Sequence, residues 1–309
     1  MSILSKAYFH DEEAAFAHLE SVLWGGEPSC PRCGSLDRIT KVKANPEKRI
    51  RVGLWRCGSC KRQFTVKIGT VFEHMRIPLH KALQAVYLMT ASKKGVSAHQ
   101  LHRILEVTYK TAWFLAHRIR EAMRSGTLDT PFGSGGGAVE VDETFIGREP
   151  TAPKGRPKPN RDQKQKLVAL VDRETGQARS MVVDNLRADT LAPILNANLA
   201  REARLMTDEA RYYKAPGKAF ASHEVVNHAR KEYARGDVTT NTVEGYFSVF
   251  KRGMKGTYHH CAKKHLHRYA AEFEFRYNNR SKLGVEDHAR FLTALDGTRG
   301  KRLTYAPVG

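Results

Sequence analysis

Hydrophobic periodicity separates a helical region of the chain from a later region of strands. Between residues 78 and 125, apolar side chains recur at the three- and four-residue spacing of amphipathic helices. Three helices are predicted there, with the sequences PLHKALQAVYLMTAS, SAHQLHRIL and TYKTAWFLAHRIREAM. Ser97 is a plausible N-cap of the second helix, and the third opens at Thr108.

From residue 138 the pattern changes to short apolar runs. Strands are predicted at AVEVDETFIG, at KLVALVD and ARSMVV around the turn RETGQ, and at ARLMTDEA and HEVVNHA. Helices are predicted at ADTLAPILNANLA and, near the end, at LHRYAAEFEFRYNNR. This order of strands and helices is that of a ribonuclease-H-like fold, an α/β class with a mixed sheet flanked by helices.

Segment 240–253, TNTVEGYFSVFKRG, is predicted to be an amphipathic helix with reactive groups beside its buried face. Its apolar face consists of Val243, Tyr246, Phe247 and Phe250. Its neighbouring face carries Asn241, Glu244, Ser248 and Lys251. Lys251 lies nearly two turns beyond Glu244, roughly 10 Å along the axis, so both project on one side. An unrelated surface pair is the alternative.

These patterns predict four segments. A helix and a cysteine-containing ribbon occupy 1–75, and a helical region occupies 76–126. The Gly-rich stretch 127–137 reads as a linker or hairpin. The ribonuclease-H-like domain covers 138–309, with a basic, Pro-rich insertion at 148–166.

Charge points to a polyanionic partner. The 309 residues include 52 Lys plus Arg against 32 Asp plus Glu, a net charge of +20. Such a chain most often faces nucleic acid, and a merely basic surface is the alternative. No apolar run approaches the roughly 18 residues of a membrane span, and the acidic start is unlike a signal peptide. A cytoplasmic protein without a membrane partner is therefore expected.

Four of the five cysteines form two C-x2-C pairs, Cys30 with Cys33 and Cys57 with Cys60, with 23 residues between the pairs. Four thiolates close a tetrahedral, structural Zn²⁺ site that has no open position for catalysis. RIRVGLWRC and KRQFTVKIGT are predicted as strands of a zinc ribbon. Disulfides are the alternative, which a reducing cytosol disfavours.

Two groups of basic residues are candidate DNA contacts. The second and third helices of the 76–126 region resemble a helix-turn-helix, with three-helix packing without DNA contact as the alternative. Its last helix carries Lys110, His117, Arg118, Arg120 and Arg124. Further along, Tyr258, His259 and His260 are expected at DNA or at the rim of an active site. Cys261 is expected to be a buried thiol rather than part of a second metal site.

Three acids stand at strand ends or on the helix 240–253: Asp142, Asp208 and Glu244. Such a trio suits two divalent cations, Mg²⁺ or Mn²⁺, held about 4 Å apart by hard oxygen ligands. Weaker candidates are Glu140, Glu143 and Glu209; Glu140 shares a strand face with Asp142, whereas Glu143 points away. Asp172 and Asp184 are expected to form turns. Lys251 would meet a DNA phosphate near the scissile bond, and Asn241 could supply an amide oxygen.

The cysteine pairs, VEVDETFIG, LMTDEA, NTVEGYFSVFKRGMKGTYHH and HLHRYAAEFEFRYN together resemble bacterial insertion-sequence DDE transposases of the ISXO type, related to Merlin transposons. The resemblance covers about residues 15 to 300. It implies Asp142, Asp208 and Glu244 as the metal-binding triad, followed by Lys251. Some relatives have asparagine in third place, so Asn241 stays an alternative; the 35 residues between Asp208 and Glu244 favour Glu244.

The expected function is that of a DNA transposase. It would bind the terminal repeats of its element, cut there and join the 3′ hydroxyls to target DNA, as a homodimer or larger assembly near the bacterial nucleoid. A non-catalytic zinc-ribbon regulator and a nuclease without strand transfer are the alternatives. The three acids argue against the regulator, and the ribbon with its helix-turn-helix argues against the simple nuclease.

Overall fold

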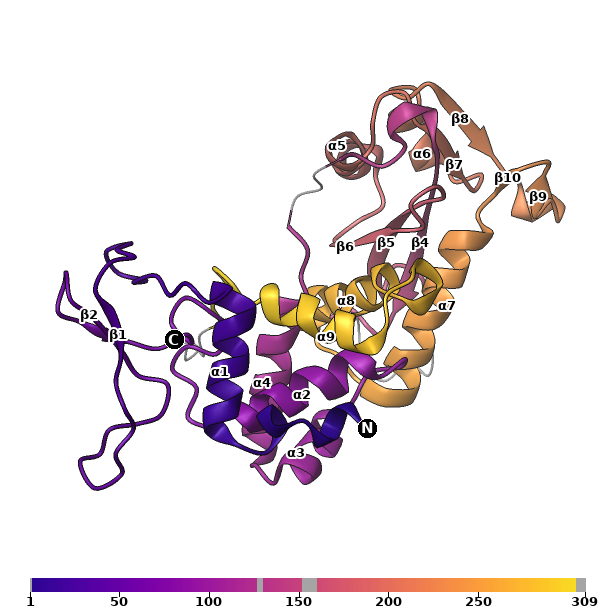
Figure 1. Ribbon diagram of the computed structural model, residues 1–309. Helices are drawn as coiled ribbons and strands as arrows, with labels where there is room; N and C mark the ends of the chain where they lie inside the picture. The colour runs from indigo at the N-terminus through magenta and orange to yellow at the C-terminus, as the bar shows by residue number, and fades with distance from the viewer. Residues whose placement is uncertain (1, 127–129, 152–159, 304–309) are drawn as a thin grey trace. The chain divides into compact units, whose positions relative to one another are not determined.

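The computed structural model describes residues 2–126, 130–151 and 160–303 (Figure 1). The chain forms two compact units. The first runs to Arg124 and resumes at Val285, and the second comprises Ser125–Gly284. The sequence-based domain 138–309 is therefore longer than the second unit, because the last helix packs with the first unit.

The first unit combines helices with a small antiparallel sheet. Its helices are α1 (Glu12–Trp24), α2 (Leu79–Ala91), α3 (Ala98–Leu105), α4 (Tyr109–Ala122) and α9 (Asp287–Asp296), and its strands are β1 (Ile39–Lys41), β2 (Trp55–Cys57) and β3 (Gln63–Phe64). The side chains of Ser97 and Thr108 accept backbone hydrogen bonds at the starts of α3 and α4, as N-caps do. The predicted caps are thus confirmed.

Phe291 of α9 is the centre of an aromatic cluster in the first unit. Its side chain is fully buried. Its ring lies 5.7 Å from that of Phe9 and 5.9 Å from those of His18 and Tyr87. Since these residues come from the first 90 positions, the carboxy-terminal helix completes a core begun at the amino terminus.

The sheet of the ribbon is smaller than the sequence pattern predicted. Its strand order is β1-β2-β3, with Ile39 opposite Cys57 and Trp55 opposite Phe64. RIRVGLWRC and KRQFTVKIGT each supply only a short strand, and β1 had no predicted counterpart. This is consistent with a ribbon held together by its cysteines more than by its strands.

The second unit is built on a mixed sheet. Its strands are β4 (Ala138–Ile146), β5 (Gln165–Asp172), β6 (Ala178–Val183), β7 (Arg204–Thr207), β8 (Ser222–Val225), β9 (Ala234–Arg235) and β10 (Val238–Thr239), and its helices are α5 (Ala188–Asn198), α6 (Arg211–Gly217), α7 (Asn241–Gly253) and α8 (Lys263–Asn278). The main sheet has the order β6-β5-β4-β7-β8. Strands β4, β5 and β6 pair antiparallel, whereas β7 is parallel to β4 and β8 to β7. The predicted ribonuclease-H-like fold is confirmed.

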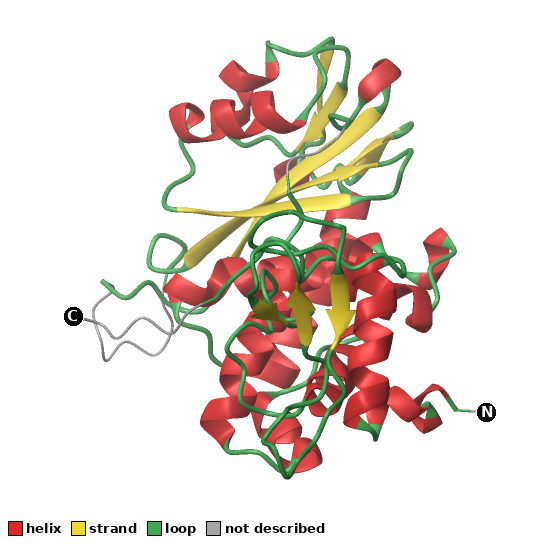
Figure 2. Ribbon diagram, turned by 60° about the vertical axis from the view of Figure 1, so that its left-hand side comes forward, coloured by secondary structure: helices red, strands yellow, loops and turns green. Residues whose placement is uncertain are grey.

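Helices cover both faces of this sheet (Figure 2). On one face, residues of β4 and β5 such as Val141 pack with Leu191 of α5 and Tyr213 of α6. On the other face, Leu167 packs with Phe250 of α7 and residues of α8. Every residue of β5 is buried, which explains its continuous apolar run. The predicted apolar face of α7 is confirmed, since all four of its residues are buried.

Two predicted connecting segments lie partly outside the described residues. Within the Gly-rich stretch 127–137, Phe132 is buried in the second unit and donates from its backbone N–H to Asn198 at 2.8 Å. Phe132 therefore belongs to the core of the second unit. The insertion 148–166 is described only at its ends, and Gln165 already begins β5. None of the described helices is long and apolar enough to cross a membrane.

Candidate active site

The four paired cysteines converge in the ribbon. The Sγ atoms of Cys30 and Cys60 lie 3.7 Å apart, as do those of Cys33 and Cys57, and all four Sγ atoms lie within 4.8 Å of one another. A zinc–sulfur bond of about 2.3 Å in a tetrahedron implies sulfur atoms about 3.8 Å apart. The backbone N–H of Cys60 donates to Cys57 Sγ and lowers the pKa of that thiol to about 6. The donor set fits a structural Zn²⁺.

A second cluster of acids forms within the main sheet, at the open edge that the central strand β4 has beyond its pairing with β7. One carboxylate oxygen each of Asp142, Glu143 and Asp208 lies within 4.8 Å of the others. Strand β4 pairs with β7 only over Ala138–Glu140, and β7 ends at Thr207. Among the described residues, none forms a partner strand for the later part of β4 on that side, and Asp208 can approach it there.

Glu143 was only a weaker candidate in the sequence, and the structure brings it into this cluster. Strand alternation places it on the face opposite Asp142, where Tyr212 and Tyr213 of α6 donate their hydroxyls to its two oxygens. Its carboxylate nevertheless reaches the cluster, because the open edge lets groups from both faces meet. Glu143 thus lies on the strand face opposite Asp142, as alternation predicted, and its carboxylate still comes within reach of Asp142 and Asp208. The sequence signal that could have pointed to Glu143 is its position directly after Asp142 in VDET.

The acid cluster is electrostatically unfavourable without a cation. Burial, followed by the neighbouring charge of Glu143, raises the pKa of Asp142 to about 7. Burial also raises the pKa of Asp208 and that of Glu143. Hard oxygen ligands gathered within reach of one another are what a divalent cation requires, so these residues fit a metal site.

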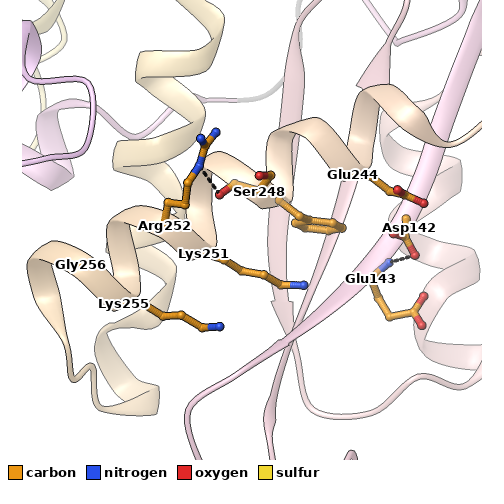
Figure 3. Close-up of a pocket in the computed structure, with 9 residues that line it drawn as sticks. Asp142, Glu143, Glu244, Ser248, Lys251, Arg252, Lys255 and Gly256 are labelled. Atoms are coloured by element: carbon orange, nitrogen blue, oxygen red, sulfur yellow. Dashed lines mark hydrogen bonds between the residues drawn. The ribbon is translucent and has the colours of Figure 1, made fainter.

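Glu244 faces the same site from α7. A cavity of about 710 Å³ is lined by Asp142, Glu143, Glu244, Phe247, Ser248, Lys251, Arg252, Lys255 and Gly256 (Figure 3). The Glu244 side chain is 48% exposed and accepts a hydrogen bond from the Thr240 hydroxyl at 3.3 Å. Asn241 is exposed at the first turn of α7 and is not among the described residues that line this cavity.

Basic side chains line the part of the cavity that lies away from the acids. Figure 3 shows the amines of Lys251 and Lys255 projecting from α7 and the segment after it toward the cavity. Burial lowers the pKa of Lys251. Both lysines also line a cavity of about 470 Å³ with His259 and His260, which are exposed. The structure thus places the two histidines around one cavity with Lys251, and their contact with DNA stays a prediction. Cys261 lines the same cavity and is only partly buried, whereas a buried thiol was expected.

The other candidate acids hold structure together. Glu140 is fully buried and pairs with Arg173 at 2.6 Å, and it does not line the cavity. Asp172 accepts the backbone N–H groups of Glu174 and Thr175, each at 2.9 Å, so it is the expected turn former. Asp184 instead pairs with Lys263 at 2.8 Å. Glu209 accepts the backbone N–H of His228 at 2.9 Å.

The basic residues of α4 do not share one exposed face. Lys110 is exposed at the start of the helix. Arg118 and Arg120 are 8% and 2% exposed, and Arg118 donates to the backbone oxygens of Val71 and Glu73. His117 is fully buried. Arg118 and Arg120 were expected to contact DNA phosphates, and this expectation is wrong, because both side chains are buried in the first unit.

Comparisons with known proteins agree with this arrangement. Residues 135–278 match the model of the ISXO2-like transposase domain, and residues 10–63 match that of the transposase zinc-ribbon domain. An uncharacterized protein in transposable element ISH50 of Halobacterium salinarum is 30% identical over 288 residues, which cover 87% of this chain and 91% of that protein.

Among solved structures, a chain in the cryoEM structure of the simian T-cell lymphotropic virus intasome in complex with PP2A regulatory subunit B56 gamma is similar at 12% identity and a TM-score of 0.28. The match spans 62% of this chain and 64% of that one. So remote a similarity supports no argument about function.

Proposed function

Since the chain belongs to the ISXO2-like transposases, we propose that it cuts DNA at the ends of its insertion sequence and joins the 3′ hydroxyls to target DNA with two divalent cations. The observation that carries this proposal is the meeting of Asp142, Glu244 and Lys251 in one cavity, with Asp208 beside Asp142. Acids for cations and an amine for a phosphate are the groups that phosphoryl transfer requires.

The proposed ligands of the cations are Asp142, Asp208 and Glu244, with Glu143 as a further carboxylate within reach. Bound Mg²⁺ or Mn²⁺ would supply activation of the attacking oxygen and stabilisation of the leaving oxygen. Glu244 is exposed enough to turn from Thr240 toward a ligand, whereas Asp142 is held by the backbone N–H of Glu143 at 2.7 Å. Asn241 lies further out on the same helix, so we assign the third place to Glu244.

Lys251 would hold the phosphate that is attacked. Its amine is partly buried beside the acids, where its charge is least screened by water and acts most strongly on a phosphate oxygen. Lys255, His259 and His260 would carry the flanking strand along the adjoining cavity. Joining two ends to one target requires two such sites, so a homodimer or larger assembly on DNA is part of the proposal.

Recognition of the element's ends is proposed for the first unit. The zinc ribbon and the α3–α4 pair are the elements there that resemble DNA-binding modules, and Lys110 is exposed on α4. The net charge of +20 supports a DNA partner through phosphate contacts.

The decisive experiment is cleavage and joining of duplexes that carry the element's ends, with Mg²⁺ or Mn²⁺. Asp142→Asn, Asp208→Asn and Glu244→Gln should each lower the rate by at least about 100-fold while the chain still folds and binds the duplex. Asn241→Ala, on the same helix, is the matched control and should retain most activity. Normal cleavage by Glu244→Gln together with failure of Asn241→Ala would assign the third ligand to Asn241. Intact cleavage in all three acid variants would refute the proposal that these acids make the protein an enzyme.

A further inference from the structure

The first turn of α7 is capped by a strand rather than by its own N-cap residue. The Thr240 side chain accepts no capping bond from a backbone N–H of the helix, although its hydroxyl donates to Glu244. Instead, Oε2 of Glu140 on β4 accepts the backbone N–H groups of Thr242 at 2.7 Å and Val243 at 3.0 Å, and Oε1 accepts the Thr242 hydroxyl at 2.8 Å. A carboxylate there satisfies orphan donors and is favoured by the helix dipole.

Arg173 fixes this carboxylate from the other side. Its Nε donates to Oε1 of Glu140 at 2.6 Å, and its Nη2 donates to the backbone oxygen of Thr239 at 3.1 Å. Its Nη1 donates to the backbone oxygen of Asp237. The same guanidinium therefore holds Glu140 and the segment that leads into α7. Glu140 is fully buried, so water does not compete for these bonds.

The position of this contact matters because of what lies two residues further on in each element. Asp142 follows Glu140 by two positions on β4, on the same face of the strand. Glu244 follows Thr242 by two positions in the first turn of α7. The contact between Glu140 and Thr242 is thus a short link between two side chains proposed to share the cations. A shift of α7 along β4 would change their separation directly.

We propose that Glu140 is a positioning residue that sets Glu244 against Asp142 by capping α7 from β4. This inference rests on the proposed two-metal reaction, because it assigns Glu140 a role only through those ligands. Misplacement of a ligand by about 1 Å is enough to weaken a site of this kind substantially. Glu140 itself stays bonded to Arg173 and to the helix and meets neither cation nor DNA.

A purely structural role predicts a different result, and Glu274 of α8 provides the comparison. It is another buried acid of the second unit, and it accepts the backbone N–H of Ser180 at 2.7 Å and the hydroxyl of Ser125. Glu274→Gln removes a buried charge, as Glu140→Gln does, but the bonds it disturbs are to β6 and Ser125. It therefore controls for lost stability alone.

The test measures binding of Mn²⁺ to the full-length chain by electron paramagnetic resonance of the free ion, alongside the Mn²⁺ concentration that gives half-maximal cleavage. Glu140→Gln should weaken Mn²⁺ binding and raise that concentration at least about tenfold, with cleavage partly restored at saturating Mn²⁺. Glu140→Asp has a shorter side chain but keeps the charge. Its Mn²⁺ affinity and its Mn²⁺ requirement should lie between those of Glu140→Gln and those of the native chain. Glu274→Gln should change neither quantity.

Equal Mn²⁺ affinities for folded Glu140→Gln and the native chain would overturn the inference. A loss of Mn²⁺ affinity in Glu274→Gln as large as that in Glu140→Gln would also overturn it. If Glu140→Gln does not fold, Thr242→Val decides, since it removes only the hydroxyl bond to Oε1. A two- to fivefold rise in the Mn²⁺ requirement would support the inference, and no rise would overturn it. Asp142→Asn separates the two proposals. If that variant binds Mn²⁺ as the native chain does, both fail; if only Glu140→Gln is unaffected, the inference alone fails.

Discussion

Tyr213 of α6 donates a hydrogen bond from its hydroxyl to Oε2 of Glu143 on β4, with 3.0 Å between the two oxygens. Tyr212 holds the other oxygen of the same carboxylate. Each carboxylate oxygen can accept more than one bond, so Glu143 keeps lone pairs for the cation that we propose it shares with Asp142 and Asp208. Two adjacent tyrosines thus determine where this acid lies.

Tyr213→Phe should reduce both stability and activity. Removal of a buried hydroxyl leaves Oε2 of Glu143 without this donor, which should lower the free energy of unfolding by about 1–2 kcal/mol in urea denaturation. Cleavage should fall as well, because Glu143 is no longer held. Tyr246→Phe removes a comparably buried hydroxyl, bonded to Ser180 at 2.9 Å, and should cost similar stability with little loss of cleavage. Equal cleavage by the two variants would contradict a role for Glu143 at the site.

The stability of the second unit should depend on pH when divalent cations are chelated. The folded chain raises the pKa of Asp142 from 3.8 to about 7, mainly by burial, so it binds this proton more tightly than the unfolded chain does. The resulting stabilisation is present below about pH 4 and is lost as the pH rises through about 7. Urea unfolding from about pH 4.5 to about pH 8 should show this decline. Asp142→Asn should flatten it, and saturating Mn²⁺ should weaken it, because the cation favours the ionised carboxylate. An unchanged profile for Asp142→Asn would exclude Asp142 as its source.

Removal of zinc should unfold the ribbon and leave the second unit folded. Four cysteines in a segment with such short strands supply much of its folding free energy through the metal. Cys33→Ser or a chelator should therefore abolish binding to the element's ends. Zinc per chain and circular dichroism measure the loss, and Cys261→Ser, outside the cluster, is the control. A zinc-free chain with unchanged end binding would disprove the prediction.

Two basic residues of α4 should behave differently when replaced. Arg118→Ala removes donors to the backbone oxygens of Val71 and Glu73 and should lower the free energy of unfolding of the first unit by about 2–3 kcal/mol. Lys110→Ala, at an exposed position, should leave stability nearly unchanged. It should reduce the slope of log K for DNA against log salt by about one. If Lys110→Ala shows the same slope of log K against log salt as the native chain, Lys110 does not contact DNA.

The strands and helices of the second unit could be predicted because their patterns are local. Alternation in β4, the apolar run of β5 and the four buried residues of α7 are all visible in short windows. The convergence of Asp142 with Glu244 was expected from a family resemblance and from element order, not from any local pattern. Side-chain alternation placed Glu143 on the face opposite Asp142 but could not show that its carboxylate reaches Asp142 and Asp208, because it does not show where a neighbouring strand ends.

The surroundings of α4 could not be predicted from its own sequence. Arginines on a helix are usually solvated, and nothing in TYKTAWFLAHRIREAM shows that residues 71–73 cover Arg118. The place of α9 is a similar case. No helix was predicted at Asp287–Asp296, and its own sequence does not show that its buried partners lie near residue 9.

The aromatic cluster around Phe291 has a consequence for synthesis of the chain. Residues 125–284 are contiguous, so a ribosome can release the whole second unit before α9 has been made. Most of the first unit is translated earlier, but its core is complete only when Phe291 has been made and packs beside Phe9 and Tyr87. The amino-terminal unit is therefore completed last. A product shortened by a stop codon shortly after residue 284 would keep its acids and lack the helix that packs against Phe9 and Tyr87.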